Sequence, residues 1–461
     1  MTQPAEDDRA AADLLRLTCE EAIHFLAGLS DRPVNNDSAP PARIALPARG
    51  VGFRAALASF RDIYGSSLTG SVGPRYFGFV TGGTTIAALA GDWLTSTFDQ
   101  NAADRTSRAA AHIEASAVAM LRELLRLPDT FSGRFVTGAT TSNMVGLAIA
   151  RQWWGRQLGV DVSERGAHGL PALTVLSGSP HSCIYKALSI LGVGRAALRR
   201  VATERGRESV DVAALRDALA ARGGQPCVVV ANAGVVNTAD FDDIAAIAAL
   251  QSQFPFFLHV DAAFGGFAAC SPTCRPLLEG WEQADSIAID AHKWLNVPYD
   301  SAIQLTRHPT LQAEVFQNVG AAYLGAPNTD DALHLTPENS RRLRALPAWM
   351  TLIAYGEAGH RAIVESSCQC ASLLGERIAD SSVFRLLAPV RMNIVVFTLS
   401  SPDPTADDVA SFLTRLRDSG QTYLTQTTYG SVQAIRAAFS NWRTTPQDVE
   451  RAWRAMLESV R

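Results

Sequence analysis

Short apolar runs alternate with Ala-rich, helix-like segments through the middle of the chain. The runs are rich in β-branched and other apolar residues, and they occupy residues 173–176, 227–231, 256–260 and 286–289. Segments such as 212–221 and 244–251 separate them. Because the runs lack strict polar–apolar alternation, they indicate strands that are covered on both faces. The pattern predicts an α/β fold in which a mostly parallel sheet lies between layers of helices.

The first part of the chain has a different pattern. Residues 13–29 show the apolar spacing of a helix, and a loop rich in Pro, Asn and Ser follows over 32–41. A second helix is predicted through Phe53, Leu57 and Phe60. Two such helices can hardly bury their apolar faces alone. We therefore expect this segment to be an arm that packs on another subunit, or else on its own chain.

The last part mixes helical segments with apolar runs at 393–399 and 434–440, which is typical of a smaller α+β domain. No internal repeat and no low-complexity tract is visible. The sequence therefore predicts three parts, which are an N-terminal helical arm (1–73), a large α/β domain (74–345) and a small C-terminal domain (346–461).

Composition narrows the class of protein. The chain has 461 residues, of which 47% are hydrophobic and 19% charged, as in compact soluble proteins of two or three folding units. Its 41 Lys and Arg against 45 Asp and Glu leave a net charge of −4 without a basic block, so nucleic acid is not an expected partner. The acidic start MTQPAEDDRA is not a secretory signal, and no segment approaches the ~20 apolar residues of a membrane span. We expect a cytoplasmic protein without a membrane partner.

The cysteines do not indicate a metal site or a disulfide framework. The seven cysteines are scattered. The pairs Cys270/Cys274 and Cys368/Cys370 lack a second pair, or His neighbours, at the spacing that zinc requires. We interpret them as reduced thiols and expect no metal site.

The first chemical motif is the segment 137–146, TGATTSNMVG, which follows a strand-like run and opens an Ala-rich helix. Such a turn offers free backbone N–H groups, hydroxyls and the positive end of the helix dipole, which together favour a phosphate. An ordinary capped helix has the same residues, because Ser and Thr are favoured N-caps.

The second motif places His181 just after a predicted strand, where open parallel sheets bind ligands. An imidazole there can stack on an aromatic cofactor and relay a proton. Taken alone, His181 is more typical of a surface loop than of a cofactor site.

The third motif, HVDAAFGG, puts Asp261 at the end of a very apolar strand. Burying an unpaired carboxylate costs several kcal/mol, so a cation should lie beside it. A protonated ring nitrogen would serve, and an arginine or a helix-capping role are the alternatives.

The fourth motif, DAHKW, puts Lys293 in apolar surroundings after the next strand. Desolvation there would free its amine to attack a carbonyl, although most lysines are simply solvated. The order of the four motifs, each after a predicted strand, is more informative than any one of them.

This series of motifs resembles the pyridoxal-phosphate (PLP) enzymes of fold type I. More narrowly, it resembles the group II amino-acid decarboxylases, which include aromatic-amino-acid and glutamate decarboxylases. Residues 74–80 (PRYFGFV) and 439–445 (FSNWRTT) extend the similarity over about residues 60 to 450. The resemblance implies a large PLP-binding domain with a mostly parallel sheet of the seven-stranded type and a smaller α+β C-terminal domain.

The resemblance also implies roles for the motif residues. Lys293 would hold pyridoxal 5′-phosphate as a Schiff base, Asp261 would pair with the pyridinium nitrogen, and His181 would stack on the ring. Further cofactor contacts are implied for the phosphate-binding turn, the phosphate neighbour and the residue under the ring, which are Thr140, Thr141, His292 and Ala263.

A catalytic loop and a substrate pocket complete the implied site. Tyr323 matches a tyrosine that reaches across a homodimer and protonates the quinonoid carbon, so active sites at the subunit interface are expected. Phe79 and Thr81 are the expected substrate-binding residues of a partly apolar pocket. Arg75 is a candidate for binding a distal carboxylate.

The expected reaction is α-decarboxylation of an L-amino acid through a quinonoid intermediate by a PLP-dependent lyase. Two outcomes are alternatives: decarboxylation coupled to oxidative deamination, which gives an aldehyde, and β-elimination from a cysteine-type substrate. A non-catalytic scaffold is a further alternative. Three departures from the family pattern bear on the outcome. Val235 offers no hydrogen bond where many relatives have Thr, and the acidic Asp290 suits the phosphate seat only if it points away. The loop around Tyr323 is also short and rich in Ala and Gly compared with the loops of decarboxylases.

Overall fold

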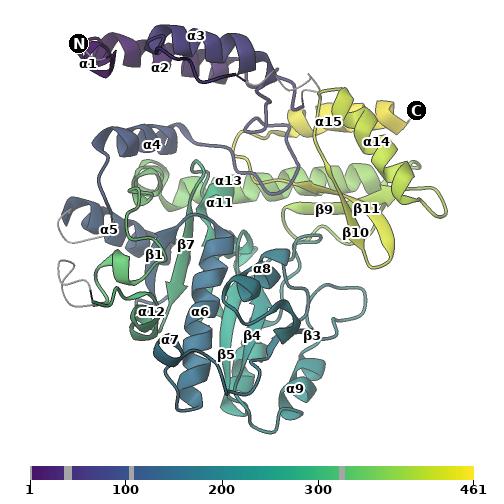
Figure 1. The fold of residues 1–461 in the computed structure, drawn as a ribbon. Helices are drawn as coiled ribbons and strands as arrows, with labels where there is room; N and C mark the ends of the chain where they lie inside the picture. The colour runs from purple at the N-terminus through teal and green to yellow at the C-terminus, as the bar shows by residue number, and fades with distance from the viewer. Residues whose placement is uncertain (1–2, 36–43, 103–107, 321–327, 461) are drawn as a thin grey trace.

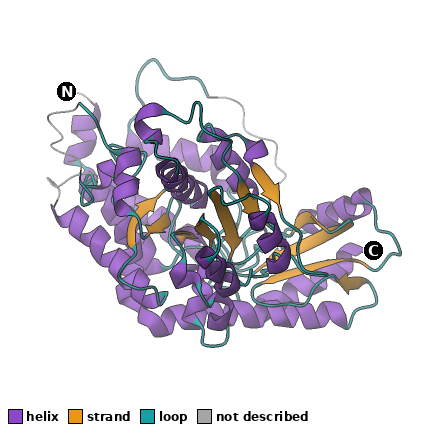
Figure 2. Ribbon diagram, turned by 90° about the horizontal axis from the view of Figure 1, so that it is seen from below, coloured by secondary structure: helices purple, strands orange, loops and turns teal. Residues whose placement is uncertain are grey.

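The computed structural model describes residues 3–35, 44–102, 108–320 and 328–460. Its large sheet lies inside a layer of helices, and a smaller sheet stands beside it near the C-terminus (Figures 1 and 2). The large sheet has seven strands in the order β1-β7-β6-β5-β4-β2-β3. The bounds of these strands are β1 Ser132–Val136, β2 Val175–Ser177, β3 Leu198–Arg200, β4 Cys227–Asn232, β5 Phe256–Asp261, β6 Ser286–Asp290 and β7 Ala302–Thr306.

The predicted α/β fold is confirmed. Strands β3, β2, β4, β5 and β6 run parallel to one another. Every residue of β4, β5 and β6 is buried, which explains why their sequences are apolar on both faces. The predicted strands match β4, β5 and β6 to within one residue at their ends, whereas β2 begins two residues later than predicted.

Strand β7 was not predicted, and it runs antiparallel to both β1 and β6. The reason is the short connection over residues 291–301, which joins β6 to β7. A parallel return needs a crossover of a dozen or more residues, so a connection of this length turns the strand back beside β6. That connection carries the lysine of the fourth motif.

Fifteen α-helices are present in the described ranges. Their bounds are α1 Gln3–Arg9, α2 Ala11–Ala27, α3 Phe53–Tyr64, α4 Ile86–Phe98, α5 Arg108–Leu124, α6 Ala139–Gln157, α7 Val162–Arg165, α8 Ser182–Ile190, α9 Val212–Ala220, α10 Ile244–Ala249, α11 Ala291–Trp294, α12 Pro309–Phe316, α13 Ala345–Ala379, α14 Ala406–Asp418 and α15 Pro446–Val460. Helix α6 lies along the large sheet, and most of its residues are buried. None of the helices in the described ranges is long and apolar enough to cross a bilayer.

The smaller sheet is antiparallel, with the strand order β10-β11-β9-β8. Its strands are β8 Phe384–Leu386, β9 Ile394–Leu399, β10 Thr425–Tyr429 and β11 Val432–Ala438. Helix α13 joins the two sheets' cores, because Leu352 and Val364 pack in the large core and Leu374 packs in the small one. A non-helical residue, Gly356, interrupts α13 between its two halves.

The arm formed by α2 and α3 lies at one end of the molecule, beyond α4 (Figure 1). No residue of α3 is buried, and Leu14 is the buried residue of α2. Leu15, Ile23 and Phe60 have exposed fractions of 66%, 59% and 47%. The arm therefore leaves much of its apolar surface uncovered within the single chain.

Candidate active site

The four sequence motifs meet at one cavity of about 750 Å³. Strands β4, β5 and β6 end there with Asn232, Asp261 and Asp290. Parallel strands present their carboxyl ends at the same edge of a sheet, and this edge is the usual ligand site of such folds. The lining residues from the motifs are Gly138, Ala139, Thr140, His181, Asp261, Ala263, Asp290, His292 and Lys293.

Asp261 is a buried carboxylate, with 6% of its surface exposed. The backbone N–H of Ala263 donates to its Oδ1 at 3.2 Å, and Nδ2 of Asn143 donates to its Oδ2 at 3.2 Å. Burial raises the pKa of Asp261, while the nearby His181 and Lys293 act in the opposite direction. No described residue forms an ion pair with Asp261, so its charge calls for a cation in the cavity. A protonated ring nitrogen of the expected cofactor fits this requirement.

Lys293 lies in the short helix α11, directly after β6. Its Nζ is 2.9 Å from Oδ2 of Asp290, and its side chain is mostly buried. The turn that carries Lys293 is fixed by Asn296, whose Nδ2 donates to the carbonyl oxygens of Gly82, Lys293 and Ser440. The amine is thereby held at the cavity next to the end of β5.

Asp290 occupies the start of α6, where a phosphate was expected. Its Oδ1 accepts a 2.6 Å hydrogen bond from the backbone N–H of Ala139, in the first turn of that helix. An acidic group was expected to suit this seat only if it pointed away, and the structure shows that it points in. Bound phosphate would therefore meet a carboxylate already bonded to one of the seat's donors. Thr140 lines the cavity, whereas Thr141 does not, and the hydroxyl of Thr141 bonds to that of Thr137 at 2.8 Å.

His181 is the N-cap residue of α8, and its Nδ1 accepts a 3.2 Å hydrogen bond from the backbone N–H of Cys183. The imidazole is exposed to the cavity but is surrounded by protein on its other sides, and this partial desolvation lowers its pKa. In the neutral ring the proton lies on Nε2. His181 therefore presents an N–H group, in a fixed orientation, to whatever fills the cavity.

His292 and Ala263 line the same cavity. Nδ1 of His292 donates to the carbonyl oxygen of Ser301 at 3.0 Å, and its ring centroid lies 4.4 Å from that of Tyr299. Burial lowers the pKa of His292, which favours the neutral ring.

Only one of the two expected substrate-binding residues lines the cavity. Phe79 lines the cavity, whereas Thr81 is not among the lining residues. Arg75, the candidate for binding a distal carboxylate, does not line the cavity. Its guanidinium is buried and donates to the carbonyl oxygens of Ser30, Arg32 and Gln421. It ties the arm to the small domain instead. Tyr323 lies outside the described residues.

Sequence reasoning missed a cation in this cavity. Arg436, from β11 of the small domain, lines it and is 6% exposed. Its guanidinium donates to the carbonyl oxygens of Val236 and Phe79 at 2.9 and 3.0 Å, and its Nε has no partner among the described residues. Burial lowers the pKa of Arg436 to about 10, so it remains charged at neutral pH. A single arginine inside the apolar run 434–440 was the available signal.

Val235 is buried and lines the same cavity as Asp261, so this departure from the family pattern lies within the site. The described residues contain no group of three or more His, Cys, Asp or Glu side chains arranged to hold a metal ion. All seven cysteines are free thiols.

Comparisons with known proteins identify a family whose enzymes use the cofactor that this site is expected to bind. A family model described as the pyridoxal-dependent decarboxylase conserved domain matches residues 44–400. An aromatic-L-amino-acid decarboxylase of Bacillus atrophaeus is 26% identical over 82% of this chain and 79% of its own length. An L-2,4-diaminobutyrate decarboxylase of Rhizobium meliloti (strain 1021) is 30% identical over 82% of this chain and 76% of its own length.

A further relative and a solved structure are also similar to this chain. A 3,4-dihydroxyphenylacetaldehyde synthase of Drosophila melanogaster is 26% identical over 88% of this chain and 82% of its own length. The crystal structure of Oryza sativa TDC with PLP and tryptamine superposes with a TM-score of 0.90 over 99% of this chain and 98% of that chain, at 24% identity. At that identity the superposition establishes the fold.

Proposed function

Because the chain belongs to the family of pyridoxal-dependent decarboxylases, we propose that its 750 Å³ cavity is the place where the α-carboxylate of an L-amino acid is removed. The chain is a PLP-dependent carbon–carbon lyase, as its motifs predicted. The observation that carries the assignment to this cavity is the convergence of Lys293, Asp261 and His181 at one sheet edge.

With the exception of Asp290, whose carboxylate points into the phosphate seat, the residues present fit the cofactor. Lys293 would hold its aldehyde, Asp261 its ring nitrogen and His181 its ring face, while the start of α6 with Thr140, and Thr141 behind it, would hold its phosphate. Ala263 and His292 would complete the cofactor's surroundings. When bound, PLP supplies an electron sink for the bonds of the substrate's α-carbon.

The chain's own residues then bind the substrate and move protons. Arg436 is a buried cation at the cavity and would attract the substrate's α-carboxylate, while the apolar wall at Phe79 would take part of its side chain. Loss of CO₂ from an amino acid consumes one proton, which must reach the α-carbon. Tyr323 remains our predicted donor of that proton, and the N–H of His181 is a donor that lines the cavity. Thr81 remains a predicted substrate contact.

A second outcome is favoured by a relative described above, the 3,4-dihydroxyphenylacetaldehyde synthase of Drosophila melanogaster. In that outcome CO₂ would be lost first, and the decarboxylated product would then react with O₂ and water to give an aldehyde, ammonia and H₂O₂. Changing the proton donor or its access is sufficient to select between the two, because only interactions made in the transition state steer the reaction.

A product assay tests the proposal. The holoenzyme is incubated with L-tryptophan, L-tyrosine, L-2,4-diaminobutyrate, L-glutamate and L-cysteine, and CO₂, amine, ammonia, H₂O₂ and pyruvate are measured. Equal amounts of CO₂ and amine are expected from at least one substrate. Ammonia and H₂O₂ with CO₂ would establish the aldehyde outcome, and pyruvate without CO₂ would establish β-elimination. The Lys293→Ala variant should lose both activity and the visible absorbance of the bound cofactor.

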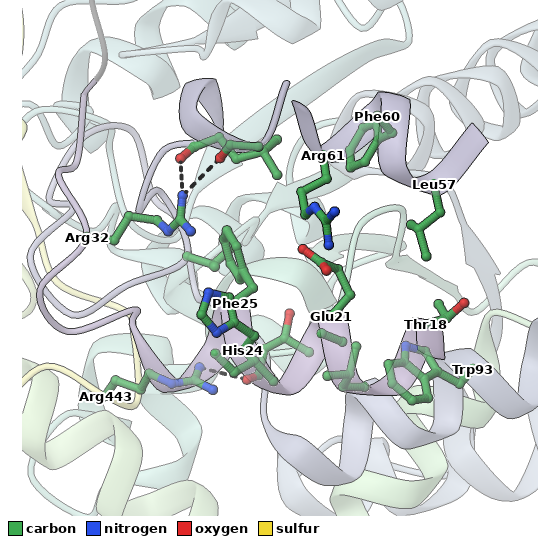
Figure 3. A pocket seen from close by; sticks show the side chains of 17 residues that line it. Thr18, Glu21, His24, Phe25, Arg32, Leu57, Phe60, Arg61, Trp93 and Arg443 are labelled. Atoms are coloured by element: carbon green, nitrogen blue, oxygen red, sulfur yellow. Dashed lines mark hydrogen bonds between the residues drawn. The ribbon is translucent and has the colours of Figure 1, made fainter. Parts of the chain in front are cut away.

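We also propose that the active protein is a homodimer. Helices α2, α3 and α4 surround an apolar cavity of about 450 Å³, which Phe25, Leu57, Phe60 and Trp93 line (Figure 3). Exposed apolar side chains continue from the arm onto α4, where Ile86 and Phe98 are each 54% exposed. A second copy of the arm offers the matching apolar surface, and contiguous exposed patches of this kind mark interfaces. Sedimentation of the active holoenzyme as a monomer would contradict the proposal.

A cytoplasmic location is proposed as well. The seven cysteines are all free thiols, and none is joined to another. Unpaired thiols persist in a reducing compartment such as the cytoplasm. Cell fractionation that finds the protein outside the cytoplasm would contradict this location.

A further inference from the structure

A line of four buried polar side chains runs from the interior of the large sheet to Asp261. Oγ of Ser286 lies 2.6 Å from Nδ1 of His259, and Nε2 of His259 lies 2.7 Å from Oδ1 of Asn143. Nδ2 of Asn143 lies 3.2 Å from Oδ2 of Asp261. Ser286, His259 and Asn143 have no exposed surface. None of these three residues reaches the cavity, so the mechanism above does not use them directly.

Helix α6, which packs on the sheet, leaves space for the side chains of this line at Gly146. A Cβ atom at Gly146 of α6 would lie 2.6 Å from Cε1 of His259 and 3.1 Å from Oγ of Ser286. Any larger residue at this position would therefore displace the imidazole. The absence of a side chain at Gly146 leaves room for His259 between α6 and the sheet.

All three hydrogen bonds point toward Asp261. A carboxylate only accepts hydrogen bonds, so the amide of Asn143 must present its Nδ2 to Asp261 and its Oδ1 to His259. The Nε2 of His259 must then carry the proton. Burial lowers the pKa of His259 to about 3, so the ring is neutral and its Nδ1 accepts from the hydroxyl of Ser286.

We propose that Ser286, His259 and Asn143 form a positioning relay that keeps Asp261 ionised and aimed at the ring nitrogen of the cofactor, an inference that rests on the proposed function. Hydrogen bonds to the charged form of a carboxyl group oppose the desolvation that would otherwise neutralise it. Aligned bonds in a low-dielectric interior also strengthen one another. Asp261 can hold a protonated ring nitrogen only while it is charged.

The other charged and titratable groups that face Asp261 stay in place when the relay is changed. They are His181 at the start of α8, Lys293 and Asp290 near the end of β6, and the thiol of Cys183, whose Sγ is 4.0 Å from Oδ2 of Asp261. Variants within the relay therefore change one contribution to the charge of Asp261. The effect should be confined to ligands whose ring carries a proton.

A cofactor analogue isolates that effect. In deazapyridoxal 5′-phosphate a C–H group replaces the ring nitrogen, so the analogue keeps the aldehyde and the phosphate but cannot be protonated on the ring. Dissociation constants of PLP and of the analogue are measured by absorbance titration of the cofactor-stripped full chain. We expect the wild type to prefer PLP by at least about tenfold, and Asn143→Leu and His259→Phe to reduce the preference to about twofold.

Three further variants complete the test. His259→Gln keeps a donor toward Asn143 and an acceptor for Ser286, so it should restore most of the preference. Ser286→Ala, at the far end, is a milder change in case the larger substitutions fail to fold, and it should reduce the preference by about two- to threefold. Ser142→Ala is the matched control, because it removes a buried hydrogen bond to the carbonyl oxygen of Ile303 from the same helical turn but outside the relay.

The outcomes separate the relay from a purely structural role. If the relay variants weaken both ligands equally, or leave the preference unchanged, the relay is wrong although the proposed function stands. The same holds if Ser142→Ala lowers the preference as much as Asn143→Leu. A wild type that shows no Lys293-dependent cofactor absorbance would overturn both proposals.

Discussion

At the scale of single residues, Gly82 marks a very close approach between the backbone near the site and another segment. A Cβ atom there would lie 1.6 Å from the carbonyl oxygen of Lys293. The loop that precedes α4 therefore passes directly against the turn that holds the reactive amine. No rotation of a side chain can relieve this contact, because both partners are backbone.

We predict that Gly82→Ala lowers the free energy of unfolding by about 3 kcal/mol, the upper end of what overpacking usually costs. Urea unfolding of the variant and the wild type measures the difference. The matched control is Gly65→Ala, because Gly65 has helical backbone angles and its Cβ would meet Arg61 at an ordinary 3.5 Å. The control should change stability by less than about 1 kcal/mol. Equal effects of the two substitutions would contradict this account.

His259 makes a pH-dependent contribution to stability. Its folded pKa is about 3, against 6.5 in an unfolded chain. Below pH 6.5 the imidazole of His259 binds a proton in the unfolded chain but stays neutral in the folded chain. The contribution of His259 to stability is therefore complete above pH 6.5 and is lost as the pH falls. Between pH 7.5 and 5.5 the loss amounts to about 1.4 kcal/mol.

We therefore predict that the wild type loses about 1.4 kcal/mol more stability than His259→Gln over this pH interval. Urea unfolding of both proteins at both pH values, at one protein concentration, gives the comparison. Other titrating groups contribute equally to both proteins and cancel. An identical pH response of the two proteins would mean that His259 is protonated in the folded chain.

At the scale of elements, the arm is the part whose packing the single chain leaves incomplete. We predict that Phe60→Glu weakens the proposed dimer at least tenfold, because it places a charge on the apolar face of α3. Sedimentation over a range of concentrations measures the shift. The matched control is Ile190→Glu, at an exposed apolar residue of α8 outside the arm. Unchanged dimerisation of Phe60→Glu would show that α3 does not contribute to the interface.

The sequence predicted those elements whose own residues carry a recognisable pattern, and it did not predict those that depend on contacts with distant residues. Strands β4, β5 and β6 were predicted because burial on both faces makes each run apolar. The four motifs could be assigned to one edge because parallel strands all end there. The antiparallel β7 depends on the length of a connection, and the arginine of β11 acts on Phe79, which lies 357 residues earlier. Contacts over such separations leave no periodic pattern in the sequence.

At the scale of the whole molecule, Asn296 joins parts that are distant along the chain. Its amide reaches Gly82, 214 residues earlier, and Ser440 of the small domain, 144 residues later. Asn296 is fully buried and has a positive φ of 54°. The turn of Lys293, the loop before α4 and the small domain therefore depend on one side chain.

We predict that Asn296→Ala lowers the free energy of unfolding by about 3 kcal/mol, because buried carbonyl groups lose their donor and a positive φ is strained for Ala. Asn296→Gly loses the same hydrogen bonds without the backbone strain, so it should be more stable than Asn296→Ala by about 1 kcal/mol. Urea unfolding of both variants checks the order. Two equally destabilised variants would show that backbone strain has no part in the effect.

The backbone at Phe79 sets a limit on how the enzyme's selectivity can be redesigned. Its φ of 54° and the hydrogen bond from Arg436 to its carbonyl oxygen fix the main chain, while 59% of the residue's surface remains open. Residues with branched β-carbons disfavour that conformation, whereas Asn, Asp and Gly adopt it readily. A mutagenesis library at this position should therefore yield folded catalysts mainly with small polar replacements, and these would widen the entrance without moving the chain around it.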